Sequence, residues 1–168
     1  MGIFKPTVLR RRVQELSPGL LRELGVRAVL LDVDNTIAPY GVRRPVAGAA
    51  QWARGLTQEG FRVVIVSNNY KKRVSSFAAQ LGLPCISFAL KPLPFGYLRA
   101  RRMLGVRCRE CAVVGDQIFT DVAGANLCGM RSVLLEPIEP EEGLSFRIRR
   151  YWEKGLREKF KERKDVIQ

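Results

Sequence analysis

Histidine is absent from the 168-residue chain. Catalytic triads built on histidine and most histidine-ligated metal sites are therefore excluded, so acid–base chemistry must fall to carboxylates, lysine, tyrosine or cysteine. Cysteine is scarce, and four residues are too few for a disulfide scaffold, so we expect a reducing, cytoplasmic environment. Cys108 and Cys111 have the spacing of half a zinc site, but no second half accompanies them, which favours ordinary structural roles for both.

The sequence also lacks an apolar stretch long enough to span a bilayer, and it does not begin with a secretory signal. Acidic residues are outnumbered: 16 Asp and Glu stand against 29 Lys and Arg, which gives a net charge of +13. This excess predicts an anionic partner. The candidates are nucleic acid, a membrane surface and a phosphorylated substrate.

Short apolar runs alternate with amphipathic segments along most of the chain. Predicted strands cover residues 28–31, 61–66, 85–88, 112–116 and 131–135, and predicted helices cover 18–24, 45–59, 70–81, 94–104 and 118–128. This alternation predicts right-handed βαβ units around a doubly wound parallel sheet, an α/β fold of Rossmann-like type. We expect one domain over residues 1–168, with its core at 25–136 and a basic amphipathic helical extension at 144–164.

Polar side chains follow four of the predicted strands at the point where each strand ends. They are Asp32 and Asp34, then Ser67, then Lys91, then Asp116 with Asp121. The carboxyl ends of parallel strands line one crevice, so we expect these groups to meet there. Carboxylates can attack phosphorus and bind Mg²⁺, while a hydroxyl and an ammonium can hold phosphoryl oxygens. For Asp32 and Asp34 taken alone, a strand that runs into a solvated turn remains an alternative.

Four short motifs, in order, resemble those of the haloacid dehalogenase-like phosphatases. Residues 32–36 resemble motif I (DxDxT), residues 66–69 motif II, Lys91-Pro92 motif III, and residues 115–121 the GDxxxxD motif IV. The short connections between the motifs leave no room for a large cap domain, as in the capless subfamily IIIA. The residues of the motifs resemble those of the bacterial YqeG-like group, which is related to mitochondrial phosphatases acting on phosphatidylglycerophosphate.

The resemblance implies Mg²⁺-dependent hydrolysis through an aspartyl-phosphate. Asp32 would be the nucleophile, and Asp34 would act first as an acid and then as a base. The implied metal ligands are Asp32, Asp116 and the backbone carbonyl of Asp34, with Asp121 beside them near Lys91 or the metal's water molecules. The implied phosphate-binding groups are Ser67, Lys91 and backbone amides near Asn35 and Asn68. For the side chains of Thr36 and Asn68, turn and backbone hydrogen bonding are equally open.

The C-terminal stretch, residues 145–164, carries apolar residues at every fourth position: Ile148, Trp152, Leu156 and Phe160. The surrounding basic residues are Arg147, Arg149, Arg150, Lys154, Arg157, Lys159, Lys161, Arg163 and Lys164. This pattern is typical of a helix that lies in an anionic lipid interface at the inner face of the membrane. The alternative is that the stripe packs on the sheet or on a partner subunit, and both hold if only the basic faces touch lipid.

We therefore expect a phosphatase, with phosphatidylglycerophosphate as the leading substrate. One alternative is a soluble phosphatase that acts on a small metabolite or on a nucleotide or RNA phosphate. Another is a non-catalytic basic adaptor that binds RNA, although such an adaptor does not need both Asp32 and Asp34.

Overall fold

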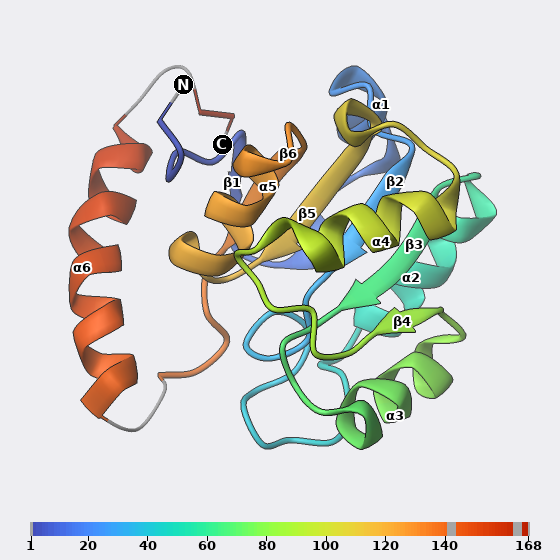
Figure 1. Ribbon diagram of the computed structural model, residues 1–168, viewed down its shortest axis with the longest axis horizontal. Helices are drawn as coiled ribbons and strands as arrows, with labels where there is room; N and C mark the ends of the chain where they lie inside the picture. Colours follow the sequence, from blue (N-terminus) through green and yellow to red (C-terminus); the bar gives the residue numbers. More distant parts are fainter. Residues whose placement is uncertain (1, 141–143, 163–165, 168) are drawn as a thin grey trace.

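Six parallel strands form one sheet in the computed structural model, in the order β1-β6-β5-β2-β3-β4 (Figure 1). The strands are β1 (Val8–Arg10), β2 (Ala28–Leu31), β3 (Arg62–Val66), β4 (Cys85–Ile86), β5 (Cys111–Gly115) and β6 (Arg131–Leu135). The helices are α1 (Pro18–Glu23), α2 (Ala49–Gln58), α3 (Lys71–Leu81), α4 (Pro94–Leu104), α5 (Ala123–Leu127) and α6 (Leu144–Lys161). Short 3₁₀ turns lie at Val13–Glu15 and Cys108–Glu110, and a π-helix at Ile118–Val122 leads into α5. The structure describes residues 2–140, 144–162 and 166–167, and of residues 144–151 it describes the backbone alone.

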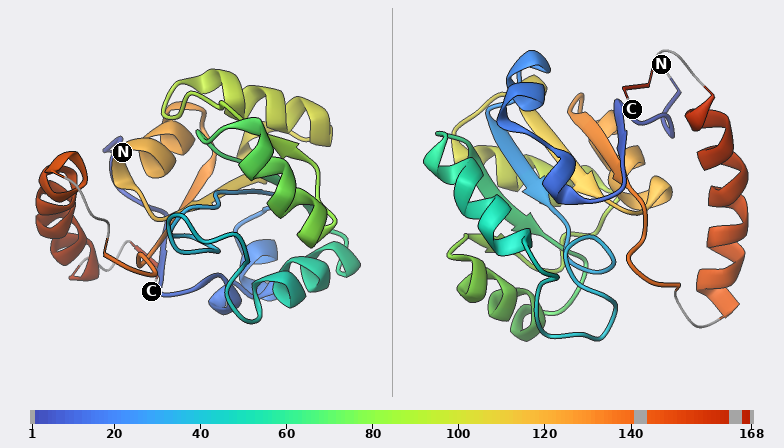
Figure 2. Two further views of the ribbon diagram at one scale, coloured as in Figure 1. Left: turned by 90° about the horizontal axis from the view of Figure 1, so that it is seen from below. Right: turned by 180° about the vertical axis from the view of Figure 1, so that it is seen from behind.

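Each strand places alternate side chains on opposite sides of the sheet, and helices cover both sides, so the sheet is buried on both faces. In β2, Val29 and Leu31 pack in the core formed with α1, α2 and α3, whereas Ala28 and Leu30 pack in the core formed with α4 and α5. In the left view of Figure 2, α4 and α5 lie on one side of the sheet and α1 and α2 on the other. The predicted α/β, Rossmann-like fold with a parallel sheet is confirmed.

Two predicted element boundaries differ from the structure by more than one residue. The second helix begins at Ala49 instead of Pro45, because Gly48 has a φ of 81° and lies in the left-handed region, outside a right-handed helix. The third predicted strand ends at Ile86 instead of Phe88, because Phe88 also has a positive φ, 48°, and turns the chain away from the sheet.

The sheet extends beyond the predicted core at one edge. β1, which the sequence analysis did not predict, pairs in parallel with β6 and places Val8 beside Val133. The C-terminal backbone then covers β1: the Leu9 N–H donates to the Ile167 carbonyl at 2.8 Å, and the Ile167 N–H donates to the Thr7 carbonyl at 3.2 Å. This pairing protects an edge that would otherwise expose unpaired backbone groups.

α6 stands beside the β1–β6 edge of the sheet (Figure 1). Phe160 is buried with Leu9 and Leu134, and Leu156 packs partly against them, whereas Trp152 is 65% exposed. At 3.6 residues per turn, eight residues place Trp152 about 80° around the helix from Phe160, so the predicted stripe does not face one surface. The C-terminal half of α6 packs on the domain through Leu156 and Phe160. The side chains of Arg147, Ile148, Arg149, Arg150, Arg163 and Lys164, which complete the predicted pattern, lie outside the described residues.

No further domain covers the strand ends in the part of the chain that the structure describes. Within residues 2–140, strands and helices alternate without an inserted cap. None of the described helices has both the length and the apolar character needed to cross a bilayer.

Candidate active site

The predicted site residues gather where the order of the strands reverses. From β2 the chain moves outward to β3 and β4, and it then returns to β5 on the other side of β2. The carboxyl ends of β2 and β5 therefore lie side by side, and the Asp32 N–H donates to the Val114 carbonyl at 2.9 Å. Ligand sites of doubly wound sheets form at such a switch point.

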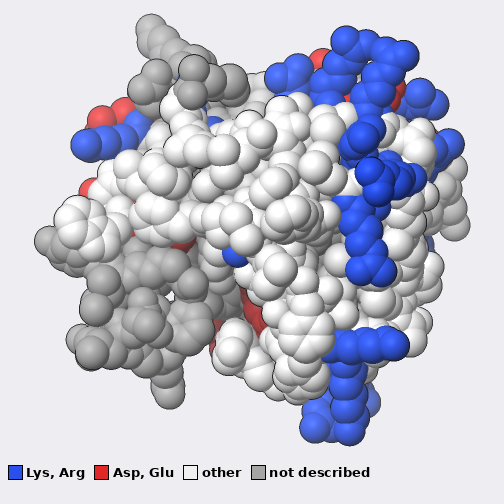
Figure 3. All heavy atoms as spheres, viewed as in Figure 1, with Lys and Arg blue, Asp and Glu red and all other residues white. Residues whose placement is uncertain are grey.

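A pocket of about 290 Å³ opens at this point. Figure 3 shows a hollow near the middle of the face seen in Figure 1, with acidic and basic atoms inside it. The pocket is lined by Asp32, Asp34, Tyr40, Ser67, Asn68, Asn69, Lys91, Gln117 and Thr120. The structure therefore brings together five of the predicted site residues from the ends of β2, β3 and β4.

Lys91 forms the centre of a buried ion-pair network at the floor of the pocket. Its Nζ lies 2.7 Å from Asp32 Oδ1 and 2.7 Å from Asp121 Oδ1. Burial disfavours the charged ammonium, but the nearby carboxylates of Asp121 and Asp32 outweigh it, so the pKa of Lys91 lies above its usual value. Lys91 is therefore a fixed positive charge at the floor of the pocket.

The position of Lys91 is set from the neighbouring strand end. The Asn68 side chain donates from Nδ2 to the Lys91 carbonyl at 3.0 Å and accepts the Lys91 N–H at Oδ1 at 2.7 Å. The Lys91–Pro92 peptide bond is cis. The Asn68 side chain thus ties the loop after β4 to the end of β3.

Three buried carboxylates lie close together beneath the pocket. Asp32, Asp116 and Asp121 each place a ligand oxygen within 4.8 Å of the others. Room for Asp121 depends on Gly115, because a β-carbon at this position would overlap the Asp121 carboxylate. Asp121 also accepts the Gln117 N–H at 3.2 Å, which links it to the loop after β5.

Burial raises the pKa of Asp32 to about 8. Lys91 opposes this shift, whereas the carboxylates of Asp121 and Asp116 add to it. A proton or a cation near Asp32 therefore stabilises the cluster.

Asp34 lies apart from this cluster and has partners of its own. Arg73 donates to Asp34 Oδ1 from Nη2 at 2.5 Å and from Nε at 3.0 Å, and Asn69 donates to Asp34 Oδ2 at 3.1 Å. Arg73 was not among the site residues predicted from the sequence. The available signal was the basic run from Lys71 to Arg73 in the first turn of α3, where the helix dipole disfavours positive charge.

The remaining predicted phosphate-binding residues have different surroundings. Ser67 lines the pocket, and its Oγ accepts the Asn69 N–H at 3.2 Å. Asn35 does not line the pocket: its backbone N–H donates to the Ala38 carbonyl at 2.7 Å, and its side chain accepts the Glu139 N–H at 3.1 Å. These contacts engage the Asn35 amide and its side-chain oxygen within the turn, and the phosphate-binding role expected at Asn35 stays a prediction.

With this geometry in view, comparison with known proteins identifies the family. The family model described as haloacid dehalogenase-like hydrolase matches residues 9–129. The chain belongs to the haloacid dehalogenase-like hydrolases. Probable phosphatase YqeG of Bacillus subtilis (strain 168) is 32% identical over 153 residues, which cover 91% of this chain and 89% of that protein. The predicted assignment as a YqeG-like phosphatase of this family is confirmed.

Two more distant similarities concern a substrate and a fold. Phosphatidylglycerophosphate phosphatase 1, chloroplastic, of Chlamydomonas reinhardtii is 27% identical over 127 residues, which cover 70% of this chain but only 47% of that protein. The solved structure of 3-deoxy-D-manno-octulosonate 8-phosphate phosphatase from Moraxella catarrhalis, in complex with magnesium and phosphate ions, has a TM-score of 0.50 at 17% identity. The matched region covers 61% of this chain and 65% of the Moraxella catarrhalis chain, and the likeness shows a shared fold.

In this haloacid dehalogenase-like hydrolase, α6 supports the acidic cluster. Glu153 is fully buried and accepts the Ile118 N–H at 2.9 Å. Arg157 donates to the Leu135 carbonyl at 2.9 Å and to the Asp116 carbonyl. α6 therefore holds the segment that carries Asp116 and Asp121, a role that the sequence analysis did not predict.

The raised pKa of Asp32 predicts how stability depends on pH in the metal-free protein. Aspartate in the unfolded chain titrates at about 3.9, whereas Asp32 titrates at about 8 in the folded protein. Between these values the folded state binds a proton that the unfolded state does not bind. The free energy of unfolding should therefore fall as pH rises through this window.

Urea unfolding of the wild type and of Asp32→Asn, in EDTA across this pH window, measures the effect. The wild type should lose stability relative to Asp32→Asn as pH rises, because the amide does not titrate. Parallel pH profiles for the two proteins would contradict the assignment.

Proposed function

We propose that this chain is a Mg²⁺-dependent phosphomonoester hydrolase that acts through an aspartyl-phosphate on Asp32. The observation that carries the proposal is the Lys91 ammonium, which bridges Asp32 and Asp121 at the floor of an open pocket. An anionic nucleophile needs this positive charge beside it if it is to approach an anionic phosphate. The ammonium also neutralises the charge that builds up on the phosphoryl oxygens in the transition state.

The reaction proceeds in two steps. An Asp32 carboxylate oxygen attacks phosphorus and the bond to the leaving oxygen breaks, while Asp34 gives its proton to that oxygen. Water then attacks phosphorus, Asp34 takes a proton from the water, and Asp32 is released with inorganic phosphate. Arg73 and Asn69 orient the Asp34 carboxylate for both transfers.

Phosphate binding falls to the groups around the pocket wall. The Ser67 hydroxyl and the Lys91 ammonium hold phosphoryl oxygens, since both residues line the pocket. The backbone at Asn68 completes the set, and the Asn68 side chain acts indirectly by holding Lys91 in place. Asn35 contributes the shape of the turn after Asp34.

The donor set of the acidic cluster fits Mg²⁺. Carboxylate oxygens are the hard ligands that this ion prefers, and three of them converge here within 4.8 Å. Asp32, Asp116 and the backbone carbonyl of Asp34 would hold the ion, with Asp121 beside them on Lys91. When bound, the ion would neutralise the carboxylates and polarise a phosphoryl oxygen.

Phosphatidylglycerophosphate at the cytoplasmic face of the membrane is our leading substrate. The partial similarity to a phosphatase of that name supports this choice. The open pocket supports it as well, because the described residues place no cap over the strand ends and a phosphate attached to a lipid can enter. The net charge of +13 favours peripheral contact with anionic lipid.

The second candidate is a soluble phosphatase that acts on a small metabolite or on a nucleotide or RNA phosphate. The open, polar pocket supports this candidate equally, because it would admit any exposed phosphomonoester. An RNA-binding adaptor without catalysis is disfavoured, because such a protein would not need the buried cluster of Asp32, Asp116 and Asp121.

A phosphate-release screen with Mg²⁺ tests the reaction and the substrate together. We expect turnover of phosphatidylglycerophosphate in mixed micelles to exceed that of soluble sugar, nucleotide and RNA phosphates. Asp32→Asn should lower turnover about a thousandfold or more while the protein stays folded, because the change is nearly isosteric but removes the nucleophile. Appreciable turnover by folded Asp32→Asn would rule out the aspartyl-phosphate. Preference for a soluble phosphate would overturn the choice of substrate but not the mechanism.

The metal site predicts a graded response to Mg²⁺. Activity should disappear in EDTA and return with Mg²⁺. Gly115→Ala displaces the Asp121 carboxylate, so it should raise the Mg²⁺ concentration for half-maximal activity by about tenfold. Gly55→Ala in α2 is the matched control, because a β-carbon there meets nothing within 4 Å. Full activity after thorough chelation, or equal Mg²⁺ dependence in both variants, would contradict the proposed site.

A further inference from the structure

Exposed apolar side chains border the pocket on the side of α4. We call Phe88, Leu90, Leu93, Phe95 and Leu98 the apolar rim. Phe88 is 63% exposed and Phe95 is 65% exposed, although both are large enough to fill a core position. Apolar side chains gathered on a surface in this way mark an interaction site more often than chance exposure does.

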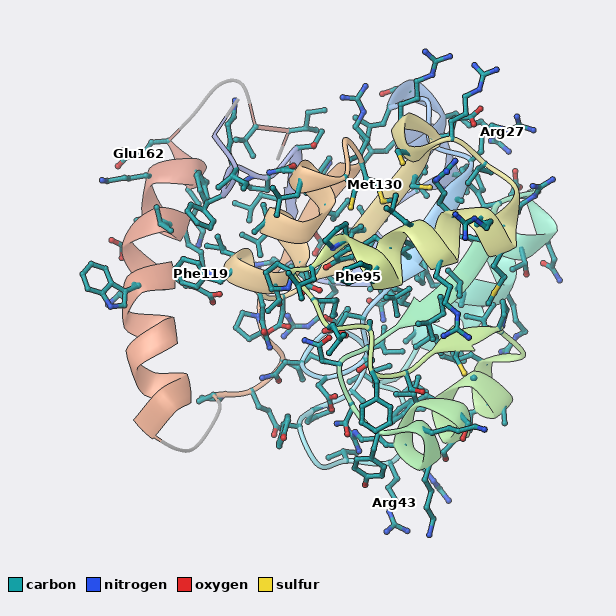
Figure 4. All side chains as sticks on the ribbon, viewed as in Figure 1. Arg27, Arg43, Phe95, Phe119, Met130 and Glu162 are labelled. Carbon is teal, nitrogen blue, oxygen red and sulfur yellow. The ribbon has the colours of Figure 1, made fainter. Side chains whose placement is uncertain are left out.

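Three residues of the apolar rim, Phe88, Leu90 and Leu93, lie in the same loop as part of the pocket wall. Lys91 lines the pocket and lies between Leu90 and Leu93 in the sequence. The Phe88 N–H donates to the carbonyl of Asn69, another pocket residue, at 3.1 Å. The loop crosses the front of the molecule between β4 and α4 in Figure 1, and Figure 4 places Phe95 on this face. A surface that contacts the apolar rim therefore faces the pocket opening.

α4 continues the apolar rim along its outer face. The buried face of the helix carries Tyr97, Ala100 and Leu104. The exposed positions follow helical spacing and combine apolar with basic residues: Phe95, Leu98, Arg99, Arg102 and Met103. Apolar and basic side chains on one exposed face are typical of a helix that rests in a lipid headgroup region.

The sign of the charge on this segment is uniform. Residues 88–109 contain no Asp or Glu, and besides the buried Lys91 they contain five basic residues: Arg99, Arg101, Arg102, Arg107 and Arg109. In Figure 3, Lys and Arg side chains gather beside the uncharged surface, over the C-terminal part of α4. This charge complements an anionic surface. It opposes pairing with a second copy of the chain through the same face, since Arg99 and Arg102 would then meet their own copies.

Two residues of the apolar rim have strained backbone conformations. Phe88 and Leu90 have φ values of 48° and 57°, a region that bulky side chains rarely adopt. Asparagine or glycine would meet the needs of the turn with less strain. Strained positions that carry exposed bulky groups are typical of functional surfaces.

We propose that the apolar rim and the exposed face of α4 dock this protein on an anionic lipid bilayer, with the pocket open toward the headgroups. This inference rests on the proposed function, because it names the surface from which a lipid-borne phosphomonoester enters the pocket. Phe88, Leu90, Leu93 and Phe95 insert between headgroups, and the arginines of α4 contact lipid phosphates. Docking here differs from the lipid alternative for α6 that the sequence left open, in which Phe160 would lie in lipid, since Phe160 is buried in the domain.

Flotation with vesicles of equal parts phosphatidylglycerol and phosphatidylcholine tests the docking surface without catalysis. The test variant is Phe88→Asn with Phe95→Gln; asparagine suits the positive φ, so the fold should be kept, and a thermal melt checks this. Trp152→Ala is the matched control, because it removes an exposed aromatic side chain from α6. We expect the double variant to bind vesicles about tenfold more weakly or worse, and the control to bind like the wild type.

Activity on two substrates separates docking from chemistry. The double variant should lose turnover of phosphatidylglycerophosphate in vesicles and keep wild-type turnover of p-nitrophenyl phosphate. Asp32→Asn should bind vesicles normally, so failure of the phosphatase proposal would leave the binding result standing. Unchanged vesicle binding by the double variant, a loss of binding in Trp152→Ala alone, or binding of structured RNA without preference for anionic over phosphatidylcholine vesicles would each overturn the docking surface.

Discussion

The buried ion-pair network around Lys91 sets the requirements that the rest of the fold meets. Charges removed from water are stable only when each has a well-placed partner, and removal of one partner leaves the other uncompensated. Asp32 comes from β2, Lys91 from the loop after β4, and Asp121 from the π-helix after β5. The sheet must therefore hold three separate segments in register. The Asn68 side chain fixes the loop of Lys91, and the space at Gly115 and the contacts of α6 fix the segment that carries Asp121.

The same network divides the molecule into an acidic interior site and a basic exterior. Carboxylates are concentrated beneath the pocket, where they attract a cation, while the excess of Lys and Arg remains on the surface, where it attracts anionic partners. Asp34 is separated from the cluster by its own pairing with Arg73, so two carboxylates that are close in sequence have different environments. This separation suits a nucleophile and a proton carrier that work side by side.

Much of this arrangement could be predicted from the sequence, because it depends on patterns that are local. Apolar runs that end in Asp32, Ser67 or Asp116 gave both the strands and the edge at which they end. Contacts between distant segments could not be predicted in this way. β1 has only three residues, too few to show a period, and it is stable because β6 and the C-terminus pair with it. Phe160 and Trp152 belong to the same four-residue repeat but have different surroundings, which only the packed helix reveals. The pairing of Arg73 with Asp34 likewise depends on the packing of α3 against β4 and α2, which brings Arg73 to the end of β2.

The central claim is that Asp32 carries the phosphoryl group, and chemical trapping tests it most directly. Enzyme mixed with substrate and Mg²⁺ is quenched and treated with borohydride, which reduces an acyl phosphate on aspartate to homoserine. Peptide mass spectrometry then locates the modified residue. The account predicts homoserine at position 32 when substrate is present, and none when substrate is left out. Turnover with modification at another residue, or with none at Asp32 under conditions that trap an acyl phosphate, would contradict it.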